Sequence, residues 1–236
     1  MLHRGPLRLH LGDAAGFADD LAAATRLGSR LTGPDVRPHL LYQETGRAML
    51  AGRWAEADRL SAQAHELYQA TSMWGAEFCL MLHRFTFARQ QGRLAEVADG
   101  LAAGAETMRM PMLRELAIVA VAEAGDPGEA RRLRRRWPER LPQDWTTDTL
   151  VAVRAWAALA LGEDPTIRYD ELLPYRGRQL VVGTAGACWG SYDLVLGRLA
   201  RAMDRPALAA EHLRAAARQG EEIGSRWQVS AAESLL

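Results

Sequence analysis

The sequence contains no lysine and no asparagine, and only two of its 236 residues are cysteine. All of its basic residues are therefore arginine, and the 29 arginines are balanced by 29 acidic residues. A chain without net charge has no long-range field that attracts nucleic acid or an anionic membrane. We therefore expect no direct binding to nucleic acid. Because alanine is also abundant, as a GC-rich coding bias would produce, the arginine content by itself is weak evidence for anion recognition.

Long apolar stretches and signal sequences are also missing. The longest apolar runs, residues 116–122 and 150–161, are shorter than the roughly 20 residues that cross a bilayer. The first ten residues contain no apolar stretch of signal-peptide length. Cys79 and Cys188 lie in separate apolar segments, where free buried thiols are the expected state in a reducing compartment. We expect a cytoplasmic protein that does not associate with membranes.

Patterns typical of catalytic or metal sites are lacking as well. The six histidines form no His-x-x-x-His arrangement, and there is no Cys-x-x-Cys, so we predict no metal and no cofactor. Ser61 and His65 are four residues apart on one helix face, but no Gly-x-Ser-x-Gly elbow is present, and we interpret them as surface polar pairing. His83, on a largely apolar face, is predicted to be a core histidine with a backbone partner. We predict no catalytic residue and a protein that is not an enzyme.

What the sequence does contain is a turn motif that recurs along the chain. It reads Gly52-Arg-Trp-Ala-Glu-Ala, Gly92-Arg-Leu-Ala-Glu-Val, Gly125-Asp-Pro-Gly-Glu-Ala and, more weakly, Gly162-Glu-Asp-Pro-Thr-Ile. The glycines are separated by 40, 33 and 37 residues, and a degenerate copy begins at Met203. A period of this size in helical material predicts an all-α array of paired antiparallel helices.

The helices on the two sides of each turn differ in their pattern. Segments after the turns carry apolar residues on a single face, whereas residues 74–87 are apolar over most of the helix circumference. Sandwiched helices alternating with one-faced helices are typical of stacked helical pairs. The expected pairs are 37–51 with 54–70, 75–91 with 94–108, 112–124 with 127–137, 147–161 with 165–174, and 188–203 with 206–222.

The two ends of the chain are expected to be half-pairs, residues 13–31 and 225–236, of one array that covers residues 1–236. The sequence stops inside an apolar helix, whereas terminal repeats normally have a polar outer face. We therefore expect the chain to be part of a longer array, or to form a homodimer through one end.

The turn motifs, each with its following glutamate, resemble those of the tetratricopeptide repeat, which implies a right-handed α-solenoid. The segment Tyr169-Asp-Glu-Leu-Leu-Pro-Tyr-Arg-Gly-Arg-Gln-Leu-Val-Val-Gly, followed by Ala187-Cys-Trp-Gly-Ser, is more specific. It is similar to a stretch in the C-terminal helical-repeat region of large bacterial signal-transduction ATPases, including LuxR-type transcriptional regulators and cyclase-linked relatives. The resemblance covers about residues 11–235.

This resemblance implies a scaffold or sensor that binds a partner or effector and restrains an attached ATPase or DNA-binding domain. The chain itself departs from the family in having no Gly-x-x-x-x-Gly-Lys-Ser/Thr phosphate loop and no separate DNA-binding module. ATP hydrolysis and sequence-specific DNA binding are therefore not carried over to it.

Two further motifs have competing interpretations. The run Arg131-Arg-Leu-Arg-Arg-Arg-Trp could contact nucleic acid, but Ala130, Leu133 and Trp137 share one helix face, so we favour a solvated arginine face. The run Gly183-Thr-Ala-Gly-Ala-Cys-Trp-Gly could cradle a phosphate, but its glycine spacing fits no nucleotide motif. We interpret its small residues as permitting close helix packing.

The first helix of each pair is expected to line a concave groove, which is the usual binding surface of stacked repeats. We predict a non-catalytic module for protein–protein or regulatory contacts within a bacterial transcriptional or signalling regulator. The alternative is a sensor whose small-molecule effector occupies the groove. Aromatic and arginine side chains are the usual anchors of such surfaces. The candidate groove residues are His39, Tyr42, Arg89, Trp156, Trp189 and Asp193.

Overall fold

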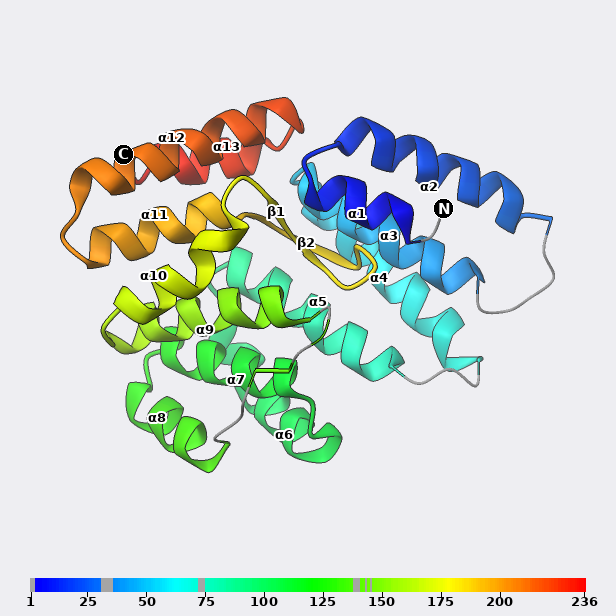
Figure 1. Cartoon of the computed structure of the whole chain (residues 1–236). Helices are drawn as coiled ribbons and strands as arrows, with labels where there is room; N and C mark the ends of the chain where they lie inside the picture. The colour runs from blue at the N-terminus through cyan, green and yellow to red at the C-terminus, as the bar shows by residue number, and fades with distance from the viewer. Residues whose placement is uncertain (1–2, 31–35, 72–74, 138–140, 143, 145) are drawn as a thin grey trace. The chain divides into compact units, whose positions relative to one another are not determined.

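The computed structural model describes residues 3–30, 36–71, 75–137, 141–142, 144 and 146–236. Within these residues the chain is mostly helical, with thirteen α-helices, two short 3-10 helices and one two-stranded sheet (Figure 1). The internal contacts divide it into two compact units. Unit 1 comprises residues 1–83, 177–194 and 213–236, and unit 2 comprises residues 84–176 and 195–212.

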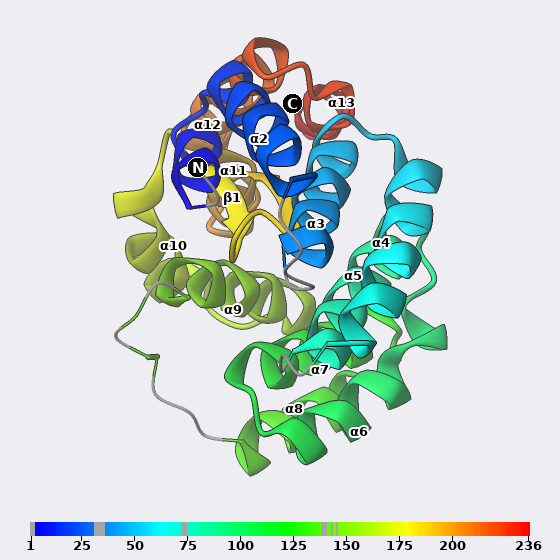
Figure 2. The ribbon, with the colours of Figure 1, turned by 90° about the vertical axis from the view of Figure 1, so that its right-hand side faces the viewer.

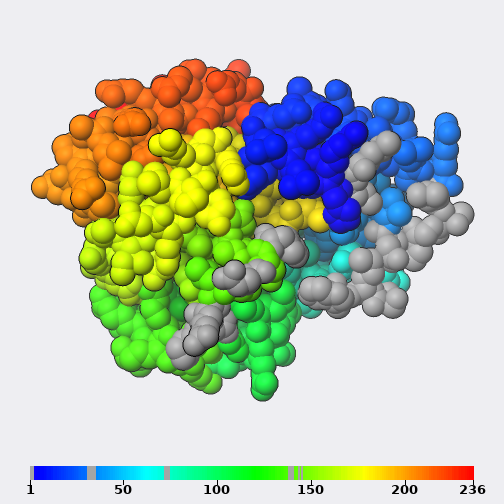
Figure 3. Space-filling model, in the orientation of Figure 1, coloured from blue at the N-terminus to red at the C-terminus, as the bar shows by residue number. Residues whose placement is uncertain are grey.

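Unit 1 combines both ends of the chain with a β-hairpin. Its elements are α1 (Arg4–His10), α2 (Ala14–Gly28), α3 (Val36–Leu50), α4 (Trp54–Gln69), the start of α5 (Ala76–Gln90), β1 (Gln179–Val182), β2 (Ala187–Ser191), the start of α11 (Tyr192–Ala202), the end of α12 (Pro206–Glu222) and α13 (Arg226–Glu233). Helices α3 and α4 pack against each other, as the views in Figures 1 and 2 agree. The outer faces of α1 and α2 form part of the molecular surface, drawn in blue in Figure 3.

Unit 2 holds the middle of the chain. Its elements are the end of α5, η1 (Leu94–Glu96), α6 (Ala98–Met108), α7 (Pro111–Glu123), α8 (Pro127–Arg136), α9 (Thr147–Leu161), α10 (Thr166–Leu172), η2 (Leu173–Tyr175), the rest of α11 and the start of α12. Helix α7 packs on α6, α8 and α9, so it is enclosed by its neighbours. We refer to α5, α7, α9 and α11 as the first helices, because each begins a helical pair.

One type of backbone turn recurs between the two helices of a pair. At Gly52 the backbone takes φ 71°, the Gly52 N–H donates to the Met49 carbonyl, and the Arg53 N–H donates to the Ala48 carbonyl. This pair of bonds with a left-handed residue is the Schellman motif, which satisfies the last carbonyls of a helix while the chain reverses. The same arrangement recurs at Gly12, Gly92, Gly125, Gly162, Asp204 and Gly224.

The recurring turn confirms the four glycine turns predicted from the sequence. In the degenerate copy, Asp204 takes the left-handed conformation at φ 55°, which aspartate tolerates better than most side chains. The turns at Gly12 and Gly224 were not predicted. The first of them joins α2 to the short helix α1, which the sequence analysis also missed.

The burial pattern confirms the alternation of sandwiched and one-faced helices. Helices α7 and α9 are buried over almost their whole circumference, at residues 112–113, 115–122, 149–153 and 155–158. In α8, by contrast, Ala130 and Leu133 alone are buried. Helix bounds agree with the first four predicted pairs to within a few residues, apart from α6, which is preceded by a 3-10 turn.

The helix predicted for residues 188–203 is wrong at its start, and the interpretation of residues 183–190 as helix packing is wrong. Residues 179–182 and 187–191 form an antiparallel hairpin, with Val181 opposite Cys188 and Val182 opposite Ala187. Adjacent β-branched valines favour a strand, and Gly183 and Ala185 take positive φ in the connecting turn. The chain is therefore mostly helical but not purely so.

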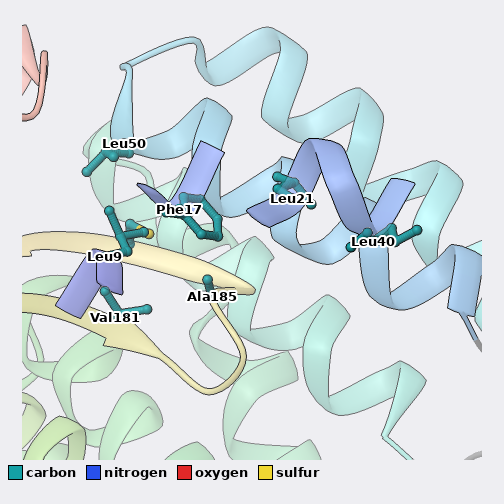
Figure 4. Close-up of a cluster of buried hydrophobic side chains, with 9 residues drawn as sticks. Leu9, Phe17, Leu21, Leu40, Leu50, Val181 and Ala185 are labelled. Atoms are coloured by element: carbon teal, nitrogen blue, oxygen red, sulfur yellow. The ribbon is translucent and has the colours of Figure 1, made fainter. Parts of the chain in front are cut away.

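The hairpin is part of the core of unit 1. Its side chains pack with those of α1, α2 and α3, as Figure 4 shows for Leu9, Phe17, Leu21, Leu40, Leu50, Val181 and Ala185. At Gly46 of α3 the hairpin turn comes so close that an added Cβ would lie 2.0 Å from the Ala185 carbonyl oxygen. Only glycine allows this approach of helix and turn.

We predict that Gly92→Ala lowers the free energy of unfolding by about 1–2 kcal/mol, because a Cβ is strained at φ 66°. Apart from the glycine itself and its chain neighbours, no described atom lies within 4 Å of that Cβ, so the expected cause is the backbone conformation and not a collision. The matched control is Gly100→Ala in α6, where φ is not positive and space is open. This change should stabilise by about 0.5–1 kcal/mol. Denaturant unfolding measures both, and equal effects would contradict the assignment of the turn.

We predict that Gly46→Ala lowers the free energy of unfolding by about 1–3 kcal/mol, because its methyl group collides with the hairpin backbone. The backbone of Gly46 is helical, so alanine would otherwise be favourable there. Chemical denaturation compares the variant with Gly100→Ala. A stabilised Gly46→Ala variant would show that the hairpin does not pack on α3.

Candidate functional site

The six residues predicted to line one groove are divided between the two units. His39, Tyr42, Trp189 and Asp193 belong to unit 1, and Arg89 and Trp156 belong to unit 2. That all six line a single groove stays a prediction. Within each unit, the contacts show what these side chains do.

In unit 1, the predicted residues support the β-hairpin. Tyr42, Trp189 and Asp193 are buried, whereas His39 is half-buried. Asp193 Oδ2 accepts hydrogen bonds from the Gly177 N–H at 2.6 Å and from Gln219 Nε2 at 2.9 Å. Two donors to one carboxylate oxygen stabilise its charge and fix the start of the hairpin to α12.

A chain of hydrogen bonds fixes the other end of the hairpin. His83 Nε2 lies 2.8 Å from the Gly186 carbonyl oxygen, and His83 Nδ1 lies 2.7 Å from the Ser61 hydroxyl. A carbonyl can only accept, so Nε2 carries the proton. Burial lowers the pKa of His83 to about 4, and the bond to Gly186 opposes this shift in part. The ring is therefore neutral at pH 7, and the Ser61 hydroxyl donates to Nδ1.

These contacts confirm the predicted role of His83 and correct that of Ser61. His83 is a core histidine, 1% exposed, with a backbone partner. Ser61 is 2% exposed and pairs with His83, so its interpretation as a surface partner of His65 is wrong. His65 Nε2 instead lies 3.4 Å from Glu77 Oε1. Although a serine hydroxyl bonded to a neutral imidazole resembles a nucleophile and base, neither group here reaches solvent, where a substrate would have to bind.

Both cysteines are free thiols. Burial raises the pKa of Cys79 to about 11 and that of Cys188 to about 12. Each thiol is therefore protonated at neutral pH and a weak nucleophile.

In unit 2, Arg89 and Trp156 are brought together by two first helices. The Arg89 guanidinium lies 3.9 Å from the centroid of the buried Trp156 ring. Two of its nitrogens donate to the two oxygens of Glu123, at 2.7 and 3.1 Å. A guanidinium stacked on an aromatic face and bound by a carboxylate fork is held in one orientation. Helices α5, α7 and α9 thus each contribute one member of a single cluster.

A fourth first helix adds Arg198, which the sequence analysis missed. Burial lowers the pKa of Arg198, repulsion from Arg89 lowers it further, and Glu123 opposes both effects. The side chain nevertheless keeps a solvent-exposed surface. Glu123 binds Arg89 with both oxygens, and in the described part of the chain Arg198 forms no ion pair. We refer to Arg89, Glu123, Trp156 and Arg198 as the arginine cluster.

Another arginine of the first helices shows how such a charge is neutralised internally. Arg154 of α9 donates from Nε to Glu115 Oε1 of α7 at 2.7 Å, and both side chains are largely buried. Within the arginine cluster two positive charges face one carboxylate. This excess positive charge is what distinguishes Arg198 from Arg154.

The run of arginines in α8 forms the solvated face that the sequence predicted. Ala130, Leu133 and Trp137 are buried, and most of the intervening arginines are exposed. Arg134 pairs with Glu163, and Arg136 pairs with Glu106 at 2.9 Å. Carboxylates of unit 2 thus neutralise part of the charge that a nucleic-acid contact would need.

Among the described residues, no three His, Cys, Asp or Glu side chains come together as a metal site. Searching those same ranges also reveals no helix long and apolar enough to cross a membrane. No protein-family model, curated protein or solved structure matches the chain.

We predict that acid weakens the fold through His83. The unfolded chain binds this proton near pH 6.5, whereas the folded chain binds it near pH 4, so the unfolded state gains the proton first as pH falls. The free energy of unfolding should drop by at most about 3 kcal/mol between these values and level off below them. Denaturant unfolding over this pH range measures the effect. The His83→Gln variant should lose that part of the pH dependence, and an unchanged profile would contradict the assignment.

Proposed function

We propose that this chain is a non-catalytic protein-interaction module of a bacterial transcriptional or signalling regulator. In this proposal its helical pairs form a right-handed, tetratricopeptide-like solenoid. The arginine cluster on the first helices of unit 2 binds an acidic segment of a protein partner. The partner is a separate protein, or an ATPase or DNA-binding domain attached to the repeat region.

Two features support the repeat part of the proposal. The same left-handed turn ends seven helices, and the enclosed helices α7 and α9 alternate with the one-faced helix α8. The Gly-Arg-x-x-Glu turns and the segment from Tyr169 resemble the repeat region of signal-transduction ATPases. Stacked repeats bury their core between neighbours and leave an extended surface for binding.

The observation that carries the binding part is the excess positive charge of the arginine cluster. Trp156 and Glu123 fix Arg89, and they leave Arg198 without an ion pair among the described residues. A carboxylate from outside the chain would restore charge balance, and a guanidinium fork suits it geometrically. Such a charge-assisted hydrogen bond contributes about 1.5–3 kcal/mol. One such bond is too weak to hold a partner by itself, so in this proposal it selects for an acidic partner and further contacts supply most of the affinity.

A second function, sensing of a small-molecule effector, is favoured by a pocket in unit 1. The pocket lies between α2, α3 and α4, and neither Trp156 nor Trp189 lines it. The pocket and the arginine cluster therefore share no lining residue.

We predict that the chain binds a short fluorescein-labelled peptide rich in glutamate, and that Arg198→Glu weakens this binding at least about tenfold. Fluorescence anisotropy measures the affinity, which should fall with added salt. The same peptide with glutamine in place of glutamate should not bind. The milder variant Arg198→Gln should show an intermediate loss, with its folding checked by circular dichroism.

The control is Arg135→Glu, which inverts an exposed arginine on α8. It changes the net charge of the chain equally but leaves the arginine cluster intact. Equal losses in Arg198→Glu and Arg135→Glu would mean that the peptide senses overall charge alone. That result, or no binding by the unaltered chain, would overturn the proposal.

A further inference from the structure

Unit 1 contains a pocket of about 600 Å³ between α2, α3 and α4. Its walls are mostly apolar, with Pro38, Leu40 and Leu41 from α3 and Leu67 from α4. The volume lies within the range of about 300–1,000 Å³ that is typical of small-molecule sites. A pocket of this size and lining suits an apolar body of drug-like dimensions.

The hydroxyl groups that line the pocket are already engaged. Thr25 donates to the Leu21 carbonyl at 2.9 Å, Ser29 to Arg26 at 2.9 Å and Thr71 to Tyr68 at 2.7 Å. Each hydroxyl thus donates its hydrogen bond to a backbone carbonyl three or four residues earlier in the chain. These side chains offer a ligand acceptor oxygens but no donor.

The charged groups of the lining are Arg37 and Glu44, and they differ in their pairing. Glu44 accepts from Arg47 at 2.7 Å, which neutralises its charge. Arg37 is exposed, and within the described ranges it forms no ion pair. Among the described lining residues, Arg37 is therefore the one positive charge without an ion pair, and it stands beside an apolar wall. Charge complementarity calls for a ligand with an anionic head.

We propose that this pocket binds a small amphipathic anion, with its apolar body against the leucines and its carboxylate on Arg37. A fatty-acid-like molecule has this chemistry, since its chain buries apolar surface and its head accepts hydrogen bonds from a guanidinium. Binding here would make unit 1 the effector-sensing part of the chain. This site shares no residue with the arginine cluster, so either proposal can fail while the other holds.

The test uses 11-dansylaminoundecanoic acid, a fluorescent fatty-acid analogue, with the full chain. We expect saturable binding of one probe per chain, displaced by dodecanoate. Arg37→Gln should lower the affinity for the probe at least fivefold. The carboxylate head of the probe then loses the only charged donor in the described lining. Ala70→Trp, which fills the pocket from its exposed rim, should also weaken it.

The control is Arg26→Gln, an exposed arginine of α2 outside the pocket lining. It should bind the probe as the unaltered chain does. Dodecanol, which lacks the charge, should displace the probe from both proteins, and its own affinity should be the same for the unaltered chain and for Arg37→Gln. No saturable binding, or equal affinities in all three variants, would overturn the proposal. Circular dichroism shows whether each variant folds, and Ala70→Trp tests the pocket independently of charge.

Discussion

The structure depends on one backbone turn, in which a residue with positive φ ends a helix and two N–H groups return to the last carbonyls. The turn satisfies polar groups that a helix end would otherwise expose, and it reverses the chain within a few residues. Because Gly52, Gly92, Gly125 and Gly162 repeat it, each second helix folds back beside the first. Once the pairs stack, α7 and α9 are enclosed, and their long apolar surfaces become core.

Enclosure of the first helices has a consequence for charge. An arginine on such a helix must find a carboxylate or keep access to solvent, because an isolated buried charge is costly. Arg154 is paired with Glu115, whereas Arg198 keeps access to solvent. The stacking that buries the apolar side chains thus also determines which arginine stays without an internal ion pair among the described residues. In unit 1, the buried bonds of His83 serve a different purpose, since they hold the hairpin where the helical repeat is interrupted.

How much of this was readable from the sequence follows from the range of each interaction. The helical pairs were predictable because their signals are local: a glycine at the turn and apolar residues three or four apart. The short helix α1 carries too few residues to show a period, and its turn at Gly12 lies outside the regular spacing. The hairpin was missed because its small residues also suit a helix interface. Its packing partner, Gly46, is more than a hundred residues away in the chain.

The candidate site shows the same limit. Arg89 and Trp156 were identified because arginine and tryptophan on first helices are common binding residues. Arg198 could not be singled out, since its importance lies in Glu123 already binding Arg89, and that pairing spans two helices. An arginine that interrupts the apolar pattern of α11 was the only local signal.

The central claim is that the first helices of unit 2 carry the partner-binding surface. Hydrogen–deuterium exchange of the full chain, with and without a bound acidic peptide, tests it most directly. The account predicts slower exchange in residues 84–90 and 195–202, which contain Arg89 and Arg198. It predicts no change in α6 and α8. Protection confined to α6 and α8, or none in unit 2, would contradict the account.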